Sequence, residues 1–189
     1  MTLYCATGNE GKLREFRLAA GAGFAIEPLM GIAAPEETGS TFEENAAEKA
    51  VYYSRSAPGL LFADDSGLEV DALDGAPGIY SARYAGNDAA NNARVLQELE
   101  NVTNRAARFV SVIALAEQGR LVKTFRGEVE GEILSEARGT GGFGYDPLFW
   151  YPPFGCSLAE VEAERKHAVS HRGKALEAML AWLRDRQRS

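Results

Sequence analysis

The sequence has 189 residues, with 20 Lys and Arg against 27 Asp and Glu, which gives a formal net charge of −7. This length suits one domain, and 46% hydrophobic with 25% charged residues is an ordinary globular composition. The negative charge excludes a uniformly basic surface, so we expect no nucleic-acid partner, although a local basic pocket for a small anion is compatible with it.

Nothing in the sequence indicates export or a membrane. Met1 is followed at once by an apolar, strand-like segment, without the basic region and cleavage site of a signal peptide. The apolar runs are far shorter than the roughly 20 residues of a membrane helix. Cys5 and Cys156 are too few and too far apart for a disulfide framework or a zinc cluster. We expect a soluble, cytoplasmic protein with reduced thiols and no membrane partner.

The first third of the chain alternates short apolar segments with helical patterns. In chain order, the predicted elements are a strand over 2–7, a helix over 12–20, a strand over 24–29, a helix over 41–54 and a strand over 59–64. Thr41, followed three residues later by Glu44, forms a capping box that supports the start of the second helix. Acidic and turn residues follow the third strand, so we expect it to end at Asp64.

The remainder of the chain predicts a long hairpin between further helices. The expected elements are an irregular segment over 71–87, a helix over 88–100, strands over 107–116 and 121–130, a strand over 147–151 and a closing helix over 170–186. Ser157 and Glu160 form a second capping box. No repeat or long linker divides the chain, so we expect one domain over 1–189 with an α/β fold and a mixed sheet.

Polar, Gly-rich loops follow the predicted strands, where α/β folds bind their ligands. The first is Thr7–Lys12, whose glycines let backbone N–H groups approach an anion at a helix N-terminus, while Lys12 adds positive charge. The segment lacks the spacing of a Walker A loop. An ordinary strand-to-helix turn has a similar pattern, so both interpretations stay open for this loop alone.

The second loop is Asp64–Gly67, which contains two adjacent carboxylates. Neighbouring carboxylates at a strand end need positive charge nearby, and Mg²⁺ held by one or two carboxylates together with phosphates is the usual source. Glu36 and Glu37, in the loop before the capped helix, are candidate further ligands. The alternative interpretation is a solvated acidic turn that caps a helix.

The third loop is Gly139–Pro147, which places glycines on both sides of Phe143. This pattern is typical of a platform on which a base stacks, because glycines allow close approach. It also has a superficial likeness to the aromatic motif of RNA-recognition domains, but Asp146 and Pro147 would end such a strand at once. The alternative is that Phe143 fills the core.

The fourth segment, 165–174, contains both histidines of the chain and four basic residues. Its alternative interpretation is a solvated helix start, which we prefer for Arg165 and Lys174. A Ser-His-Asp hydrolase is disfavoured because no nucleophile elbow surrounds Ser66 or Ser170. An anion loop, a carboxylate metal site, an aromatic platform and a basic clamp together indicate an enzyme that acts on a nucleoside polyphosphate.

The sequence also resembles the inosine/xanthosine triphosphate pyrophosphatases. The resemblance follows the chain in order at 6–12, 63–68, 75–84, 139–147 and 170–173. It implies an elongated mixed β-sheet flanked by helices, with two lobes around a central nucleotide cleft, and a homodimer. It implies hydrolysis of deaminated purine nucleoside triphosphates (dITP, ITP, XTP and dXTP) to the monophosphate and pyrophosphate, which cleanses the nucleotide pool.

The resemblance also assigns site residues. Asp65 would be catalytic, orienting or deprotonating the attacking water, and Mg²⁺, with Mn²⁺ as a possible substitute, would bind Glu36 and Asp65. Alignment by eye leaves Glu36 and Glu37 exchangeable. The residues assigned to substrate binding are those at the phosphates, Thr7, Gly8, Asn9, Glu10, Gly11, Lys12, Lys49 and Ser66, and those at the base, Phe143, Gly144, Tyr145, Asp146, Lys166, His171 and Arg172.

Selection of the base requires a donor facing the C6 carbonyl of inosine or xanthosine. Arg172 is the main candidate, with His171 and backbone N–H groups near Phe143 to Asp146 as others. Two alternatives stay open: a pyrophosphatase for other modified bases, and a nucleotide- or RNA-binding module without turnover. The paired carboxylates argue against the second alternative.

Overall fold

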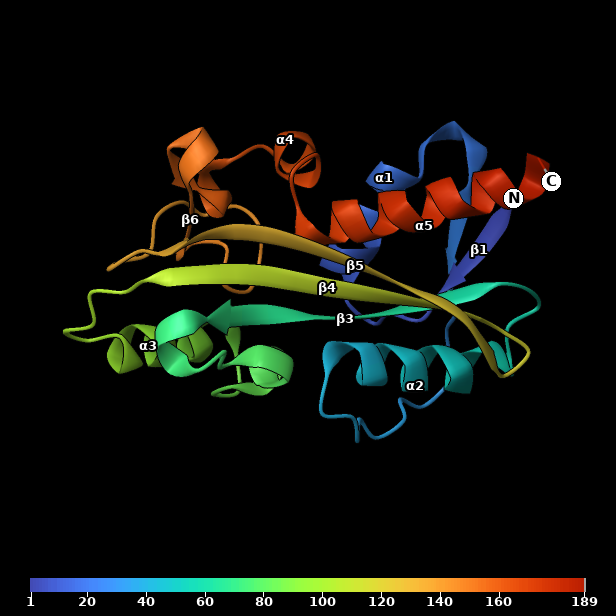
Figure 1. Cartoon of the computed structure of the whole chain (residues 1–189), viewed down its shortest axis with the longest axis horizontal. Coiled ribbons are helices and arrows are strands. Elements are labelled where there is room, and N and C mark those ends of the chain that lie inside the picture. The colour runs from blue at the N-terminus through green and yellow to red at the C-terminus, as the bar shows by residue number, and fades with distance from the viewer. Residues whose placement is uncertain (189) are drawn as a thin grey trace. The chain divides into compact units, whose positions relative to one another are not determined.

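The computed structural model describes residues 1–188, which form a seven-stranded sheet and its covering helices (Figure 1). The strands are β1 (Thr2–Cys5), β2 (Ala25–Pro28), β3 (Leu61–Val70), β4 (Ala106–Glu117), β5 (Arg120–Ile133), β6 (Phe149–Tyr151) and β7 (Cys156–Ser157). The α-helices are α1 (Glu10–Ala20), α2 (Phe42–Ser54), α3 (Asp88–Glu98), α4 (Ala163–His167) and α5 (His171–Arg188).

The strand order is β2-β1-β3-β4-β5-β6-β7. β1 pairs in parallel with β2 and β3, whereas β6 pairs antiparallel with β5 and β7. The predicted α/β fold with a mixed sheet is therefore confirmed. No helix within 1–188 has the length and apolar character needed to cross a membrane.

The chain divides into two compact units. The first unit comprises Met1–Asp65, Ser111–Gly127 and Ser170–Ser189, and the second comprises Ser66–Val110 and Glu128–Val169. Strands β3, β4 and β5 contribute residues to both units. A single catalytic domain over 1–189, with lobes around a nucleotide cleft, stays a prediction.

The first unit has a core between one face of its strands and helices α1 and α5 (Figure 1). Helix α1 has a buried stripe because Phe16 and Ala20 recur at helical spacing, and the Phe16 ring meets Phe62 of β3 edge-on at 5.2 Å. Helix α5 contributes Leu176 and Met179 to the same core. Helix α2 covers the other face of the strands, so polar side chains can approach the strands of this unit from both sides.

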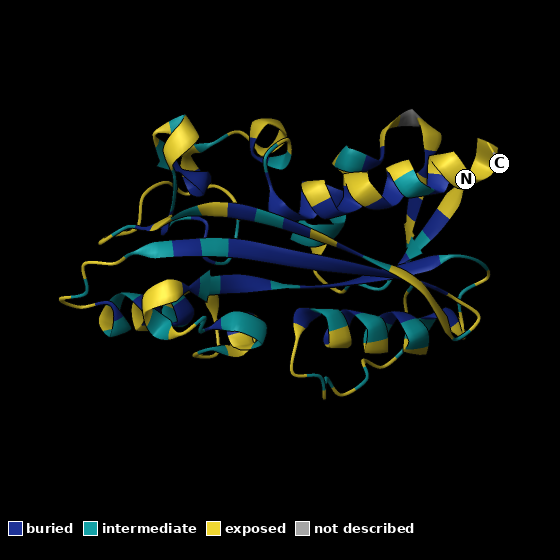
Figure 2. Cartoon of the chain, in the orientation of Figure 1, coloured by how far each residue is buried: buried dark blue, intermediate teal, exposed yellow. Residues whose placement is uncertain are grey.

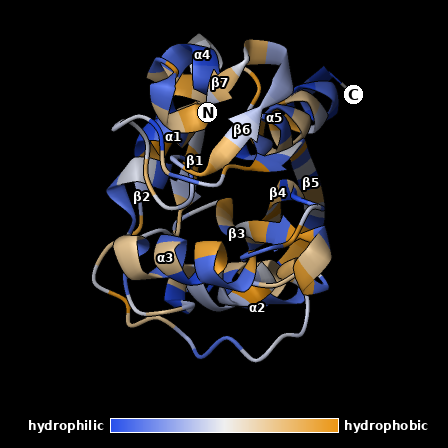
Figure 3. Cartoon of the chain, turned by 90° about the vertical axis from the view of Figure 1, so that its left-hand side faces the viewer, coloured by the Kyte–Doolittle hydropathy of each residue, from blue (hydrophilic) through white to orange (hydrophobic). Residues whose placement is uncertain are grey.

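The second unit has its own core, which includes Val95 and Leu99 of the α3 segment and Phe109 and Phe149 of the strands. The two phenylalanine rings lie 4.4 Å apart. Helix α3 carries both hydrophobic and hydrophilic residues around its axis, as a half-buried helix should (Figure 3). The buried colouring along β4 shows that this central strand is covered on both faces (Figure 2).

Several predicted boundaries shift for identifiable reasons. Helix α1 begins at Glu10, two residues early, because the side chain of Asn9 accepts a hydrogen bond from the backbone N–H of Lys12 at 3.0 Å. Asn87 caps α3 in the same way, so this helix begins at Asp88 as predicted. The predicted end of β3 at Asp64 is wrong, because this strand continues for six further residues to Val70.

The predicted hairpin and second capping box are confirmed. The turn between β4 and β5 has positive φ at Gln118 and Gly119, as a tight hairpin requires. Ser157 and Glu160 satisfy each other's backbone N–H groups. Both cysteines are free, and burial raises the pKa of the Cys5 thiol well above its usual value.

Candidate active site

Asp64 and Asp65 lie inside β3, where consecutive side chains point to opposite faces of the sheet. Asp64 therefore meets the helices of one face and Asp65 meets α2 on the other. Both carboxylates are buried, at 4% and 7% residue exposure. Buried carboxylates require compensation by charge or hydrogen bonds, and the first unit supplies a different set of partners to each.

Asp64 is neutralised by cations from two helices. Its Oδ2 lies 2.8 Å from Nζ of Lys12 on α1 and 3.9 Å from Nε of Arg172 on α5. The guanidinium of Arg172 also lies 3.1 Å from the carboxylate of Glu15, one turn after Lys12. Although burial opposes ionisation, the charges of Lys12, Arg172 and Lys49 hold the pKa of Asp64 below its ordinary value. Asp64 is thus an ionised anchor for two cations.

The negative charge of the buried Asp65 carboxylate is less fully compensated than that of Asp64. Oδ2 of Asp65 accepts a hydrogen bond from Nδ2 of buried Asn45 at 3.2 Å, and Oδ1 lies 3.2 Å from Nζ of Lys49. The same ammonium also binds Glu37 at 3.0 Å. Burial raises the pKa of Asp65 above its usual value; Lys49 opposes this shift and the negative charge of Glu37 adds to it. Asp65 therefore takes up a proton more readily than its neighbour.

Neighbouring carboxylates with opposite pKa shifts are typical of sites in which one anchors charge and the other accepts a proton. Asp64 is the anchor and Asp65 is the candidate base. Lys49 lies beside Asp65 and keeps its positive charge. Burial opposes the charged form, but Asp65, Asp64 and Glu37 outweigh this effect and raise the pKa of the ammonium.

The loop before α1 has the geometry of an anion site. Thr7 Oγ1 accepts a hydrogen bond from the Asn9 backbone, and Asn9 caps the helix. The N–H groups of Glu10 and Gly11 lie in the first turn, where a helix has no internal partners for them. A Cβ at Gly8 would meet no atom within 4 Å, so this glycine leaves open space beside the backbone. These features are typical of an anion site at a helix N-terminus, and phosphate binding by this loop stays a prediction.

Oxygen donors suited to Mg²⁺ gather at Asp65. Glu37 and Asp65 share one ammonium, and the buried Oδ1 of Asn45 has no hydrogen-bond partner within the described residues. Glu36, the predicted ligand, is exposed in the adjoining loop. Within 1–188, no group of three His, Cys, Asp or Glu side chains is arranged to hold a metal. This donor set fits an ion that uses one or two carboxylates and completes its shell with phosphate and water.

The second unit contains a separate polar cluster around the Gly-rich loop. Lys166 and Asp146 are 4% and 3% exposed, and Nζ of Lys166 lies 2.6 Å from Oδ2 of Asp146. The same oxygen accepts a hydrogen bond from the Phe143 backbone at 2.9 Å. The ammonium of Lys166 lies 5.0 Å from the centre of the half-buried Phe143 ring. A cation over an aromatic face is stabilising, and both residues belong to the set predicted to meet the base.

The loop itself depends on two glycines and one buried tyrosine. Gly142 and Gly144 have φ of +69° and +62°, and a Cβ on Gly142 would lie 2.1 Å from Asp146 Oδ2. The hydroxyl of Tyr145 donates to the backbone carbonyl of Ser81 at 2.8 Å, and burial raises the pKa of this phenol. Tyr145 is 5% exposed, so it supports the loop from inside.

The structure distributes the predicted residues between the two units. Lys12, Lys49, Asp65 and the Thr7–Lys12 loop share the first unit, whereas Ser66 begins the second unit as a half-buried residue of β3. His171 and Arg172 are buried in the first unit at the start of α5, although we predicted them at the base. Their role in closing over the base stays a prediction.

Sequence reasoning missed three contributors. Glu15 and Asn45 gave no local signal, because a charged or amide residue on an amphipathic helix usually faces solvent. Asp88 was predicted only as the first residue of a helix, yet its carboxylate accepts a hydrogen bond from the backbone N–H of Gly144. Arg165 and Lys174 are exposed, in agreement with the solvated interpretation preferred for them.

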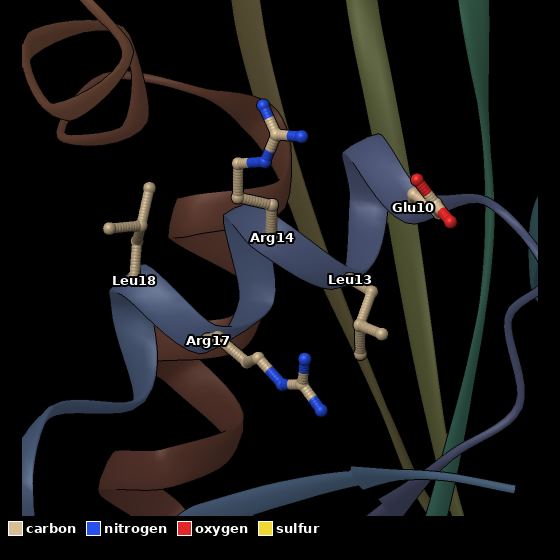
Figure 4. Close-up of a pocket in the computed structure, with 5 residues that line it drawn as sticks. All are labelled: Glu10, Leu13, Arg14, Arg17 and Leu18. Atoms are coloured by element: carbon tan, nitrogen blue, oxygen red, sulfur yellow. The ribbon is translucent and has the colours of Figure 1, made fainter.

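A surface hollow of about 450 Å³ lies along α1 (Figure 4). It is lined by Glu10, Leu13, Arg14, Arg17 and Leu18. Of these residues only Glu10 belongs to the predicted site, and the hydrogen bonds and ion pairs described for Asp64 and Asp65 involve none of the five. The hollow therefore does not define the candidate active site.

Known proteins resemble this chain over nearly its full length. The sequence profile of the Ham1 family matches residues 3–182. A dITP/XTP pyrophosphatase of Acidobacterium capsulatum is 49% identical, with 97% of this chain and 98% of the relative covered. Another from Exiguobacterium sp. is 50% identical over 96% of each chain. The solved structure of a HAM1 protein from Coxiella burnetii has a TM-score of 0.89 at 39% identity, covering 98% of this chain and 99% of that chain.

Proposed function

The chain belongs to the Ham1 family, and we propose that it hydrolyses deaminated purine nucleoside triphosphates, dITP and XTP above all, to the monophosphate and pyrophosphate. The observation that carries this proposal is the contrast between Asp64 and Asp65. Asp64 lies between the cations Lys12 and Arg172, whereas Asp65 is held by Asn45 and Lys49 on the other face of β3. A carboxylate held in this way can orient an attacking water and accept its proton.

Asp65 would accept the proton of the attacking water. Its two oxygens are held by Asn45 and Lys49, so the carboxylate has a fixed orientation and still offers free lone pairs. Phosphoryl transfer requires a placed nucleophile and charge stabilisation but little covalent help. A positioned carboxylate therefore meets the main requirement at the nucleophile, which is to hold the attacking water in place.

The proposed cofactor is Mg²⁺, with Mn²⁺ as a substitute, held by Glu36 and Asp65. When bound, the ion would neutralise phosphate charge and lower the pKa of water. The resemblance assigns Glu36 as the second ligand, and Glu37, which lies 3.0 Å from Nζ of Lys49 beside Asp65, is the alternative. The carboxylate oxygens favour hard divalent ions over soft metals.

The triphosphate would be held by the loop before α1 and by two lysines. The first-turn N–H groups of α1 and the helix dipole favour an anion at this position. Lys12 and Lys49 are each anchored by a carboxylate and lie at 19% and 15% side-chain exposure. Because these side chains are already held in place, their charges can balance the negative charge of a pyrophosphate leaving group without further ordering.

The base would be recognised by the cluster of the second unit. Phe143 supplies a stacking face and Lys166 a buried donor beside it. The backbone N–H groups of Phe143 and Gly144 already donate to Asp146 and Asp88. Because these two backbone N–H groups are already engaged, we expect a side chain to donate the hydrogen bond to the C6 carbonyl.

Pyrophosphate release tests the proposed function. We expect the purified chain with Mg²⁺ to release pyrophosphate, not orthophosphate, from dITP and XTP, with kcat/KM at least about a hundredfold above that for dATP, because mismatched buried donors allow such ratios. Preference for modified pyrimidine triphosphates would favour the alternative pyrophosphatase. Nucleotide binding without any pyrophosphate release would favour the non-catalytic module and refute the proposal.

The choice of metal ligand has its own test. We expect Glu36→Gln to raise the half-saturating Mg²⁺ concentration about tenfold or more, since even indirect metal partners have effects of this size. Glu37→Gln is the matched control, because it removes a neighbouring carboxylate that pairs with Lys49. Direct Mn²⁺ binding measured by electron paramagnetic resonance gives a readout independent of turnover. A larger rise in the half-saturating Mg²⁺ concentration for Glu37→Gln than for Glu36→Gln would assign the ligand to Glu37.

The resemblance also implies a homodimer, which we propose as the state in solution. Light scattering of the purified chain at micromolar concentration measures the mass directly. A monomer mass would contradict this part of the proposal without bearing on the chemistry of Asp65.

A further inference from the structure

Two side chains of α3 hold the backbone of the Gly-rich loop. Oδ2 of Asp88 accepts a hydrogen bond from the Gly144 N–H at 2.9 Å, and Nδ2 of Asn92 donates to the Gly144 carbonyl at 3.0 Å. All three residues belong to the second unit. Asp88 and Asn92 are four residues apart and therefore lie on one face of the helix. Together they engage both backbone polar groups of a single residue.

This contact fixes the peptide groups on either side of Gly144. The N–H belongs to the peptide that joins Phe143 to Gly144, and the carbonyl to the peptide that joins Gly144 to Tyr145. Gly144 has a φ of +62°, and a Cβ there would meet no atom within 4 Å. The glycine is therefore required by its backbone conformation and not by close packing. Without external contacts, a glycine in an open loop would sample many conformations.

Other contacts of the loop are made within it and with neighbouring segments of the same unit. Asp146 accepts from the backbone of Phe143, and Tyr145 donates to the carbonyl of Ser81. Among the hydrogen bonds described for this loop, those that hold Gly144 itself come from the pair on α3. The orientation of the Phe143 ring thus depends on α3 as well as on Asp146.

Asn92 also contributes unfavourably to the stability of the fold. Its Oδ1 is buried and has no hydrogen-bond partner within residues 1–188. A buried unsatisfied oxygen is unfavourable for stability and calls for another explanation. The hydrogen bond from its Nδ2 to Gly144 supplies that explanation, because it places the loop and not merely the helix.

We propose that Asp88 and Asn92 are positioning residues that hold the Gly-rich loop in the conformation that binds the purine base, and so set the affinity for the nucleotide. The inference rests on the proposed function. Neither residue contacts the carboxylate cluster of the first unit in the described contacts, so their loss should affect nucleotide binding and leave the chemical step intact.

Kinetics of Asp88→Ala and Asn92→Ala test the proposal. We expect each variant to raise the KM for dITP about fivefold, which corresponds to one ordinary hydrogen bond, with kcat within about twofold of the parent. The dissociation constant of dIMP, measured by calorimetry, should rise by the same factor. Asp88→Asn retains an oxygen that can accept from the Gly144 N–H, so it should restore nearly parental KM.

Asn87→Ala is the matched structural control. Asn87 caps the same helix by accepting from the Ala90 N–H at 2.9 Å and is not a partner of Gly144 in the described contacts. Its loss should lower the Tm and leave KM unchanged. An equal rise in KM in Asn87→Ala, unchanged KM and dIMP affinity in both alanine variants, or Asp88→Asn as poor as Asp88→Ala would each overturn the inference. A parent enzyme that releases no pyrophosphate from dITP would instead refute the proposed function.

Discussion

We expect Asp65→Asn to lower kcat for dITP at least about a thousandfold, or about 4 kcal/mol of activation free energy, while the fold stays intact. The amide cannot accept the proton of the attacking water and is a poor ligand for Mg²⁺. Its shape matches the carboxylate, so packing between β3 and α2 is preserved. Pyrophosphate release at saturating dITP and Mg²⁺ measures the loss, and circular dichroism checks the fold.

The pKa of Asp65 predicts the effect of this variant on stability. Because burial raises the pKa of Asp65, the ionised carboxylate disfavours the folded state at pH values above its unfolded pKa. Asparagine carries no charge, so the variant should unfold at a Tm close to or above that of the parent. A large fall in Tm would show that the loss of activity reflects misfolding and would leave Asp65 without a demonstrated role.

Asp64→Asn is the matched control, because it changes the adjacent carboxylate. Its expected effect on the Tm is opposite to that of Asp65→Asn. The cations around Asp64 hold its pKa below the ordinary value, so ionised Asp64 stabilises the fold above its unfolded pKa. This contribution is lost as the pH falls through the folded pKa. Asp64→Asn should therefore lower the Tm at neutral pH, and the difference from the parent should shrink in acid. Equal losses of kcat in both variants would contradict the assignment of Asp65 alone as base.

Much of the fold was predictable because local signals agree with tertiary packing. The N-cap at Thr41, the hairpin turn at Gln118 and Gly119 and the apolar spacing of α1 all appear where expected, although Glu44 accepts from the backbone of Ser40 and does not complete the predicted capping box with Thr41. The end of β3 was not predictable. Two adjacent aspartates normally interrupt a strand, and here Asp64 and Asp65 continue it because distant lysines and an arginine neutralise them. Local propensity carries no information about those partners.

The candidate site shows the same limit. The sequence indicated Lys12 and Asp65 through recognisable motifs, and Lys49 through the family resemblance. It did not indicate Glu15, whose burial depends on Arg172, 157 residues further along the chain. Asn45 gave no signal either, because its contact with Asp65 depends on how α2 packs on β3. Residues that support a site through long-range contacts are invisible until the fold is known.

The second large effect is expected for Lys166→Met. This substitution leaves the buried carboxylate of Asp146 without its ammonium, and removing one member of a buried pair costs about 3–5 kcal/mol of stability. It also removes the cation that lies 5.0 Å from the Phe143 ring centre. We expect a large fall in Tm and a loss of kcat/KM for dITP of at least about a hundredfold, equivalent to about 2.7 kcal/mol.

The double variant Lys166→Met with Asp146→Asn separates stability from function. The introduced amide oxygen can still accept the hydrogen bond that the Phe143 backbone donates to Asp146 at 2.9 Å, and the substituted pair carries no charge. Replacing a buried pair by neutral groups is often close to neutral for stability, so the Tm should return toward that of the parent. The kcat/KM for dITP should stay low, and its ratio to that for dATP should fall, because the buried donor for the C6 carbonyl is absent. Recovery of activity together with the Tm would show that Lys166 only balances the charge of Asp146, and the base would then have to be read by another side chain.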